Sequence, residues 1–152
     1  MRHPIHPMLV HFPIACWSLA TLADLVSLLY GEPYGWLAGV LMLAGLLLAM
    51  PAMLAGLMDM TKIEAHSRAI DIVNQHMIVV IMSWSLYALS LFARTEGTTI
   101  NTPDFIAIAL SLLGFIFLGA AGWLGGKMVY ELGIGVDQYP INTKNEACDE
   151  SI

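Results

Sequence analysis

The sequence predicts an all-α, polytopic membrane protein built as a bundle of four transmembrane helices. Of the 152 residues, 58% are hydrophobic and only 12% are charged, and the mean hydropathy is +0.73. A soluble domain carries about a quarter charged residues, so this chain has too little polar surface to cover a water-soluble globule. The stretches without Asp, Glu, Lys or Arg are long and cover residues 3–23, 33–58, 72–93 and 105–126.

Each charge-free stretch is long enough for an α-helix to cross the hydrocarbon core of a bilayer, which is about 30 Å thick. Helices are expected because lipid cannot satisfy backbone N–H and C=O groups, and the alternation of a transmembrane β-barrel is absent. The expected spans are 7–30, 34–58, 72–94 and 103–127. Together they form a transmembrane domain over residues 1–132, and a short polar tail follows over residues 133–152.

Local signals mark the starts of these helices. Pro7, Pro33 and Pro103 lie near the starts of the first, second and fourth spans, where a missing backbone N–H leaves no helical hydrogen bond unmade. Thr61 followed by Glu64 matches a capping box. The third helix is therefore expected to begin directly after Thr61, before its charge-free part.

The distribution of basic residues predicts the orientation. An even number of spans places both ends of the chain on the same side of the membrane. That side carries five of the six Lys and Arg residues, and the opposite side carries only Arg94. By the positive-inside rule, we expect a multi-pass membrane protein with both termini in the cytoplasm.

Charge and cysteine content exclude several functions. The net charge of −6 argues against a nucleic-acid partner, which needs a basic face. Cys16 and Cys148 form neither a disulfide framework nor a zinc pattern. No Ser–His or Cys–His arrangement indicates a nucleophile, so we name no catalytic residue. Asp24 lies about two turns from the far end of the first helix, and Arg94 on the same side is its natural partner in a structural ion pair.

The five histidines all fall in the cytoplasmic half of this arrangement. His11 and His76 each lie four residues past the start of their span, on helices that run in the same direction, and therefore reach a similar depth. His66 lies ten residues before His76, roughly 15 Å further along the helix axis. We expect a deeper pair of His11 with His76 and a shallower pair of His66 with His6 or His3.

Facing imidazoles in a helical bundle are suited to holding haem b through its two axial positions. Trp17 and Trp84 lie about two turns below the deeper pair and are expected to form the floor of the haem pocket. The sequence thus predicts a b-type cytochrome-like electron-transfer protein with one or two haems per chain. It would be an electron carrier or an oxidoreductase subunit, surrounded by membrane lipid and serving a redox partner that the sequence does not identify.

Two other functions stay open. Histidines near the headgroups can also hydrogen-bond water or lipid without binding a cofactor. If the five histidines do only this, the chain is a cofactor-free structural or regulatory membrane subunit. A metal-handling protein would instead bind copper or zinc through His11, His76, His66 and His6. Pairs of small residues four apart, such as Gly122 with Gly126, favour close helix packing and are compatible with a homodimer.

One further set of residues forms a recognisable pattern: HPMLVHFP over residues 6–13, Asp24, Gly56, Asp59, His76, and GWLGG over residues 122–126. In this pattern the chain resembles a bacterial family of small four-span membrane proteins known only as a domain of unknown function. The resemblance extends to about Val136 and implies a multi-pass protein of the bacterial inner membrane. It also implies a relative of membrane redox modules, with His6, His11 and His76 at the family's histidine positions. Where a later family histidine is expected, this chain has Glu131 and Leu132.

Overall fold

The computed structural model describes residues 5–61 and 68–134, and these form helices except for one short hairpin. The helices are α1 (Ile5–Leu9), α2 (His11–Tyr30), α3 (Glu32–Met60), α4 (Arg68–Ala93) and α5 (Phe105–Tyr130). The antiparallel strands β1 (Thr95–Glu96) and β2 (Thr99–Ile100) join α4 to α5. Because α1 and α2 form one span, four segments are long and apolar enough to cross a membrane, which confirms the predicted fold class.

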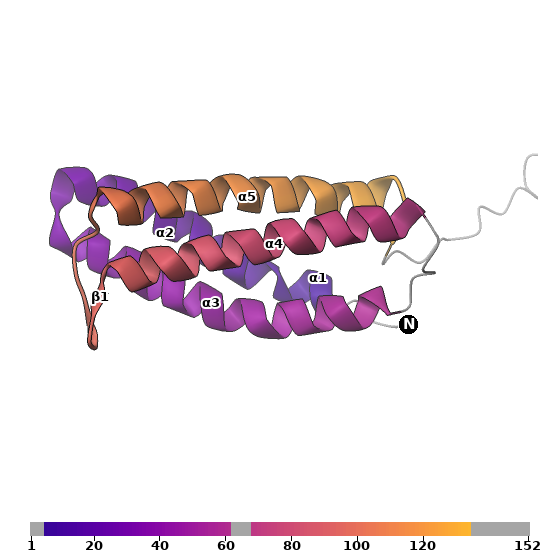
Figure 1. The fold of residues 1–152 in the computed structure, drawn as a ribbon, viewed down its shortest axis with the longest axis horizontal. Coiled ribbons are helices and arrows are strands. Elements are labelled where there is room, and N and C mark those ends of the chain that lie inside the picture. The colour runs from indigo at the N-terminus through magenta and orange to yellow at the C-terminus, as the bar shows by residue number, and fades with distance from the viewer. Residues whose placement is uncertain (1–4, 62–67, 135–152) are drawn as a thin grey trace, which may run out of the picture.

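The long helices lie side by side along the axis of the molecule (Figure 1). α2 packs against α3 and α5, and α4 packs against α5 and α3, so α2 and α4 face each other across the bundle diagonal. We call the end that carries the β1–β2 turn the hairpin end. The opposite end contains α1, the last turn of α3, the start of α4 and the last turn of α5, and we call it the histidine end.

The first span is interrupted at Val10, between α1 and α2. Pro13 is the physical reason, because it has no N–H to donate to the carbonyl of Leu9 and its ring crowds that carbonyl. Backbone bonds continue on either side, from the N–H of Val10 to the carbonyl of His6 at 3.1 Å and from that of Ile14 to Val10 at 3.2 Å. Val10 itself keeps helical dihedral angles, with φ of −64° and ψ of −23°, so the interruption is slight and the helical periodicity of α2 continues into α1.

The other helix ends follow local chemistry. Gly31, between α2 and α3, has a φ of 79°, a conformation that residues with a Cβ rarely adopt. Pro33 lies in the first turn of α3 as expected. Pro103 instead precedes α5, whose N-cap is Asp104: its side chain accepts a hydrogen bond from the N–H of Ala107 at 2.8 Å.

Thr61 lies at the end of α3. Its hydroxyl donates to the carbonyl of Met58 at 2.7 Å. The rest of the predicted capping box, and the predicted helix start after Thr61, fall on residues 62–67, outside the described residues. Most of the polar tail predicted for 133–152 also lies outside them, since the description ends at residue 134.

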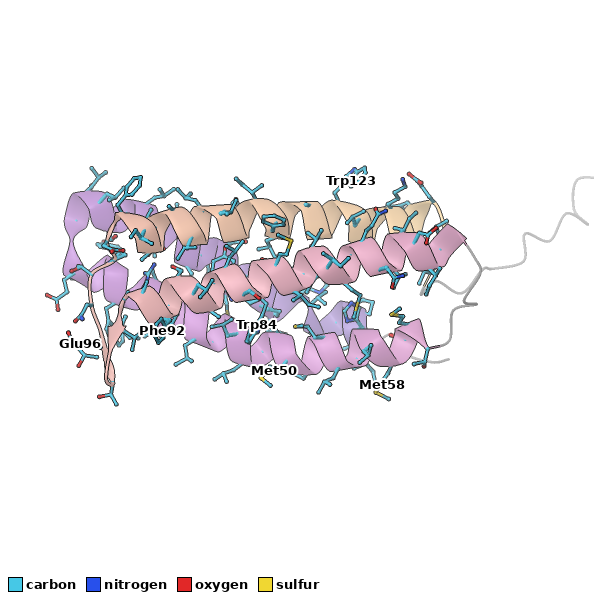
Figure 2. All side chains as sticks on the ribbon, in the orientation of Figure 1. Met50, Met58, Trp84, Phe92, Glu96 and Trp123 are labelled. Carbon is cyan, nitrogen blue, oxygen red and sulfur yellow. The ribbon has the colours of Figure 1, made fainter. Side chains whose placement is uncertain are left out.

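Large side chains fill the middle of the bundle. The buried core cluster consists of Trp17, Ala20, Met42, Leu46, Ala49 and Tyr87. The rings of Trp17 and Tyr87 stack with their centroids 5.0 Å apart, and Trp17 lies on Gly45, where a Cβ would overlap the indole. Trp84 lies between α4 and α3 and donates to the carbonyl of Leu46 at 3.4 Å (Figure 2). Both predicted floor residues thus pack within the bundle interior.

Candidate functional site

The first described histidine, His6, is held by α3. Its Nδ1 lies 2.7 Å from the carbonyl oxygen of Ala52. The ring rests on Gly56, where an added Cβ would come within 2.9 Å of the imidazole Cε1. A carbonyl oxygen only accepts hydrogen bonds, so Nδ1 carries the proton, and in the neutral ring the lone pair is on Nε2.

His76 is held in the same way by α5. Its Nδ1 lies 3.0 Å from the carbonyl oxygen of Ala121. Gly125 lies one turn further along α5, where an added Cβ would be 3.7 Å from the imidazole Cε1. This ring too has its proton on Nδ1 and, when neutral, its lone pair on Nε2.

Both imidazoles lie at the histidine end and face neighbouring helices, His6 toward α3 and His76 toward α5. They come from α1 and α4, while the carbonyls that orient them belong to α3 and α5. The residues that bond the rings or lie beneath them include Ala52, Gly56, Ala121 and Gly125, all of which are small.

His11 does not join this region, and the structure does not support the expected pair of His11 with His76. Its side chain is exposed, whereas Pro13 and Trp17 on the same helix are buried. Residues two apart on an α-helix differ by about 200° in direction, so a helix that buries Pro13 turns His11 outward. The sequence predicted the pair from the depth of His11 and His76 along the helix axes. The direction of His11 around its helix axis is what prevents the pairing.

The second predicted tier lies mostly outside the description. His3 and His66 belong to residues 1–4 and 62–67, so their pairing with His6 stays a prediction. Among residues 5–61 and 68–134, no group of three or more His, Cys, Asp or Glu side chains is placed to hold a metal ion.

The hairpin end contains the predicted ion pair. Asp24 of α2 is 0% exposed and Arg94, directly after α4, is 2% exposed. The guanidinium binds the carboxylate in a bidentate manner, with Nη1 2.5 Å from Oδ1 and Nη2 2.9 Å from Oδ2. This confirms the prediction that Arg94 is the partner of Asp24.

Hydroxyl groups complete the ion pair. Ser111 of α5 donates to Oδ2 of Asp24 at 2.6 Å. Ser90 of α4 accepts from Nη2 of Arg94 at 2.9 Å, its carbonyl accepts from Nε at 3.3 Å, and its own hydroxyl donates to the carbonyl of Ala107 at 2.7 Å. Both charges are therefore satisfied by the chain itself, and α2, α4 and α5 are tied together at this end.

A polar stripe on α4 extends from this cluster toward the middle of the bundle. Its members, Ser83, Tyr87, Ser90 and Arg94, are all buried and follow one another at spacings of four, three and four residues. The hydroxyl of Tyr87 crosses to α2, where it lies 2.7 Å from Oγ1 of Thr21 and donates to the carbonyl of Trp17 at 3.2 Å. This stripe was not predicted from the sequence, although its helical spacing was readable there.

The model of a family described as a predicted membrane protein, DUF2231, matches residues 2–138. The chain belongs to the DUF2231 family. This confirms the predicted membership of a membrane protein family of unknown function. No curated protein matches the chain, and no solved structure matches it.

The DUF2231 match includes both polar regions of the bundle. His6 and His76 at the histidine end, and Asp24 and Arg94 at the hairpin end, all lie within residues 2–138. Both arrangements are therefore parts of the family domain in this chain.

Proposed function

We propose that this DUF2231 protein is a membrane electron-transfer protein that holds one haem b through Nε2 of His6 and Nε2 of His76. The proposal rests on one observation: the two imidazole rings make the same type of hydrogen bond and have the same tautomer. Each has its Nδ1–H donated to a backbone carbonyl, which leaves Nε2 free to bind iron. A metal-binding histidine almost always donates its other N–H in this way. When bound, haem supplies the one-electron redox change.

The residues present fit such a group. Two neutral imidazoles are the usual axial ligands of a b-type haem in a helical bundle. Small residues lie on the sides of the rings that face α3 and α5, in contrast to the large side chains of Trp17, Met42 and Tyr87 in the core cluster. A bulky apolar macrocycle is therefore more compatible with the histidine end than with the middle of the bundle.

The chain's own residues orient the ligands. The carbonyls of Ala52 and Ala121 set the ring tautomers and increase the basicity of each Nε2. Gly56 lets the imidazole of His6 lie close to the backbone of α3. The redox partner would approach the histidine end, which the proposal places on the cytoplasmic side of a bacterial inner membrane.

Spectroscopy of the purified protein tests the proposal. Expression with a haem precursor should yield one haem per chain and a reduced-minus-oxidised spectrum typical of a b-type cytochrome. His6→Ala and His76→Ala should each lose most of the Soret absorbance, whereas His11→Ala, which removes an exposed imidazole, should retain it. A colourless wild-type protein, or a complete Soret band in His76→Ala, would contradict the proposal.

One observation favours a second candidate, a cofactor-free structural subunit. The same two hydrogen bonds attach α1 to α3 and α4 to α5, which is a structural task for both histidines. This candidate predicts a colourless and metal-free protein, whereas a metal-handling protein predicts stoichiometric copper or zinc by elemental analysis.

A further inference from the structure

Two neighbouring hollows open on the outer face of α4 and α5 and share Trp123. The first has a volume of about 310 Å³ and is lined by Gln75, Ile78, Val79, Ala120, Trp123 and Leu124. The second, of about 270 Å³, is lined by Trp123, Gly126, Lys127, Tyr130 and Glu131. Trp123 is 68% exposed and points away from the bundle (Figure 2). Together the hollows form a groove that runs toward the histidine end.

The two hollows differ in chemistry. The first is mostly apolar, with Gln75 as its one amide. The second contains opposite charges: Nζ of Lys127 lies 3.8 Å from Oε2 of Glu131 and 5.5 Å from the centre of the Trp123 ring. Tyr130 beside them is 91% exposed. The groove thus has an apolar part and a part with one positive and one negative group.

The order of these parts matches their expected depth in a bilayer. Lys127 and Glu131 lie at the end of α5, where a membrane-spanning helix reaches the headgroups. Ala120 lies seven residues earlier, which is about 10 Å deeper along the helix axis. Tryptophan and tyrosine are enriched at the boundary between headgroups and acyl chains, and Trp123 and Tyr130 fit that level.

We infer that this groove binds a phospholipid with a zwitterionic, primary-ammonium headgroup, as in phosphatidylethanolamine. Lys127 would contact the phosphate and Glu131 the ammonium, while an acyl chain lies along Ile78, Val79 and Ala120. Charge complementarity selects this lipid. A purely anionic headgroup would face the carboxylate of Glu131, and a choline headgroup has no N–H to donate to that carboxylate.

Native mass spectrometry of the full chain, offered equal amounts of ethanolamine, choline and glycerol phospholipids with identical acyl chains, tests the inference. The wild type should retain the ethanolamine lipid about threefold better than the choline lipid, as expected for one partly exposed ionic contact. Glu131→Gln should abolish this preference. Lys127→Ala should lower retention of all three phospholipids.

Phe105→Ala provides the control. Phe105 is also an exposed aromatic residue of α5, but it lies at the opposite end of that helix from the groove. This variant should leave lipid retention unchanged. Equal retention of the three lipids by the wild type would overturn the inference, as would an unchanged preference in Glu131→Gln. A lipid-free dimer that covers Trp123 in crosslinking would overturn it as well. These outcomes do not depend on whether the protein binds haem.

Discussion

The two ends of the bundle differ in how completely their polar side chains are hydrogen-bonded. At the hairpin end, Asp24 and Arg94 satisfy each other, and Ser90 and Ser111 complete their hydrogen bonds. At the histidine end, the backbone satisfies only one nitrogen of each ring, since the hydrogen bonds of His6 and His76 are made by Nδ1. A closed set of partners indicates a structural clamp, whereas an available nitrogen lone pair indicates a binding site.

Packing is tight at the hairpin end. The hairpin end is sealed by the loop between α4 and α5: Ile100 fits against Gly39, and Pro103 against Gly35, with no room for a Cβ at either glycine. At the histidine end, Gly56 is also in close contact, with the ring of His6, whereas Gly125 has its nearest neighbour at 3.7 Å, which is ordinary van der Waals contact. The hairpin end is therefore expected to control stability, and the histidine end to control what the protein binds.

The largest effect is expected from breaking the ion pair. Asp24→Ala leaves Arg94 charged and without its partner in the bundle interior, and should lower the free energy of unfolding by about 3–5 kcal/mol. Unfolding in mixed detergent and SDS micelles measures this. Glu96→Ala is the control, because this acid is exposed two residues beyond Arg94 (Figure 2) and its loss should change stability by less than about 0.5 kcal/mol. Equal effects in the two variants would show that the pair does not clamp the bundle.

The next effect concerns packing in the core. Gly45→Ala would place a methyl group on the indole of Trp17 and should destabilise the protein by about 1–3 kcal/mol. Gly119→Ala, on α5, meets no atom within 4 Å and should leave stability nearly unchanged. The same unfolding assay compares them, and a tolerated Gly45→Ala would contradict the close contact of Trp17 with α3.

A substitution at the histidine end should affect binding more than stability. Gly56→Ala would displace the ring of His6 and should weaken haem binding about tenfold, as is typical when a group that orients a metal ligand is altered. Haem titration of the haem-free protein measures the change. Gly122→Ala, which meets no atom within 4 Å, is the matched control. Identical haem affinities in the two variants would rule out His6 as a positioned ligand.

The smallest effect is expected within the polar stripe, at Tyr87. Tyr87→Phe keeps the stacking on Trp17 but removes the hydroxyl that meets Thr21 and the carbonyl of Trp17. Hydrogen bonds between membrane helices contribute about 0.6 kcal/mol on average, so a loss of that size is expected. A double-mutant cycle with Thr21→Val isolates the contact. Additive losses would indicate that the two hydroxyls are not coupled.

The features that were predicted correctly from the sequence are those that depend on composition and on position along a helix. Charge-free stretches predicted the four spans, and the scarcity of ionisable groups on one side predicted the pairing of Asp24 with Arg94. His11 was misplaced because its direction around α2 differs from that of the buried face: α2 buries Pro13 and Trp17, and His11 points the other way. His6 lies seven residues before Pro13 and eleven before Trp17, so the spacing of this buried face extends to His6 and was readable in the sequence.

The central claim is that the histidine end binds haem and the hairpin end holds the bundle together. Haem content and unfolding free energy, measured on the same preparations of His76→Ala and Asp24→Ala, test it most directly. His76→Ala should bind no haem. The unfolding free energy of its haem-free form should nevertheless stay within about 1 kcal/mol of that of the haem-free wild type. Asp24→Ala should be strongly destabilised and still carry one haem per folded chain. Full haem content in His76→Ala, or unaltered stability in Asp24→Ala, would contradict this division.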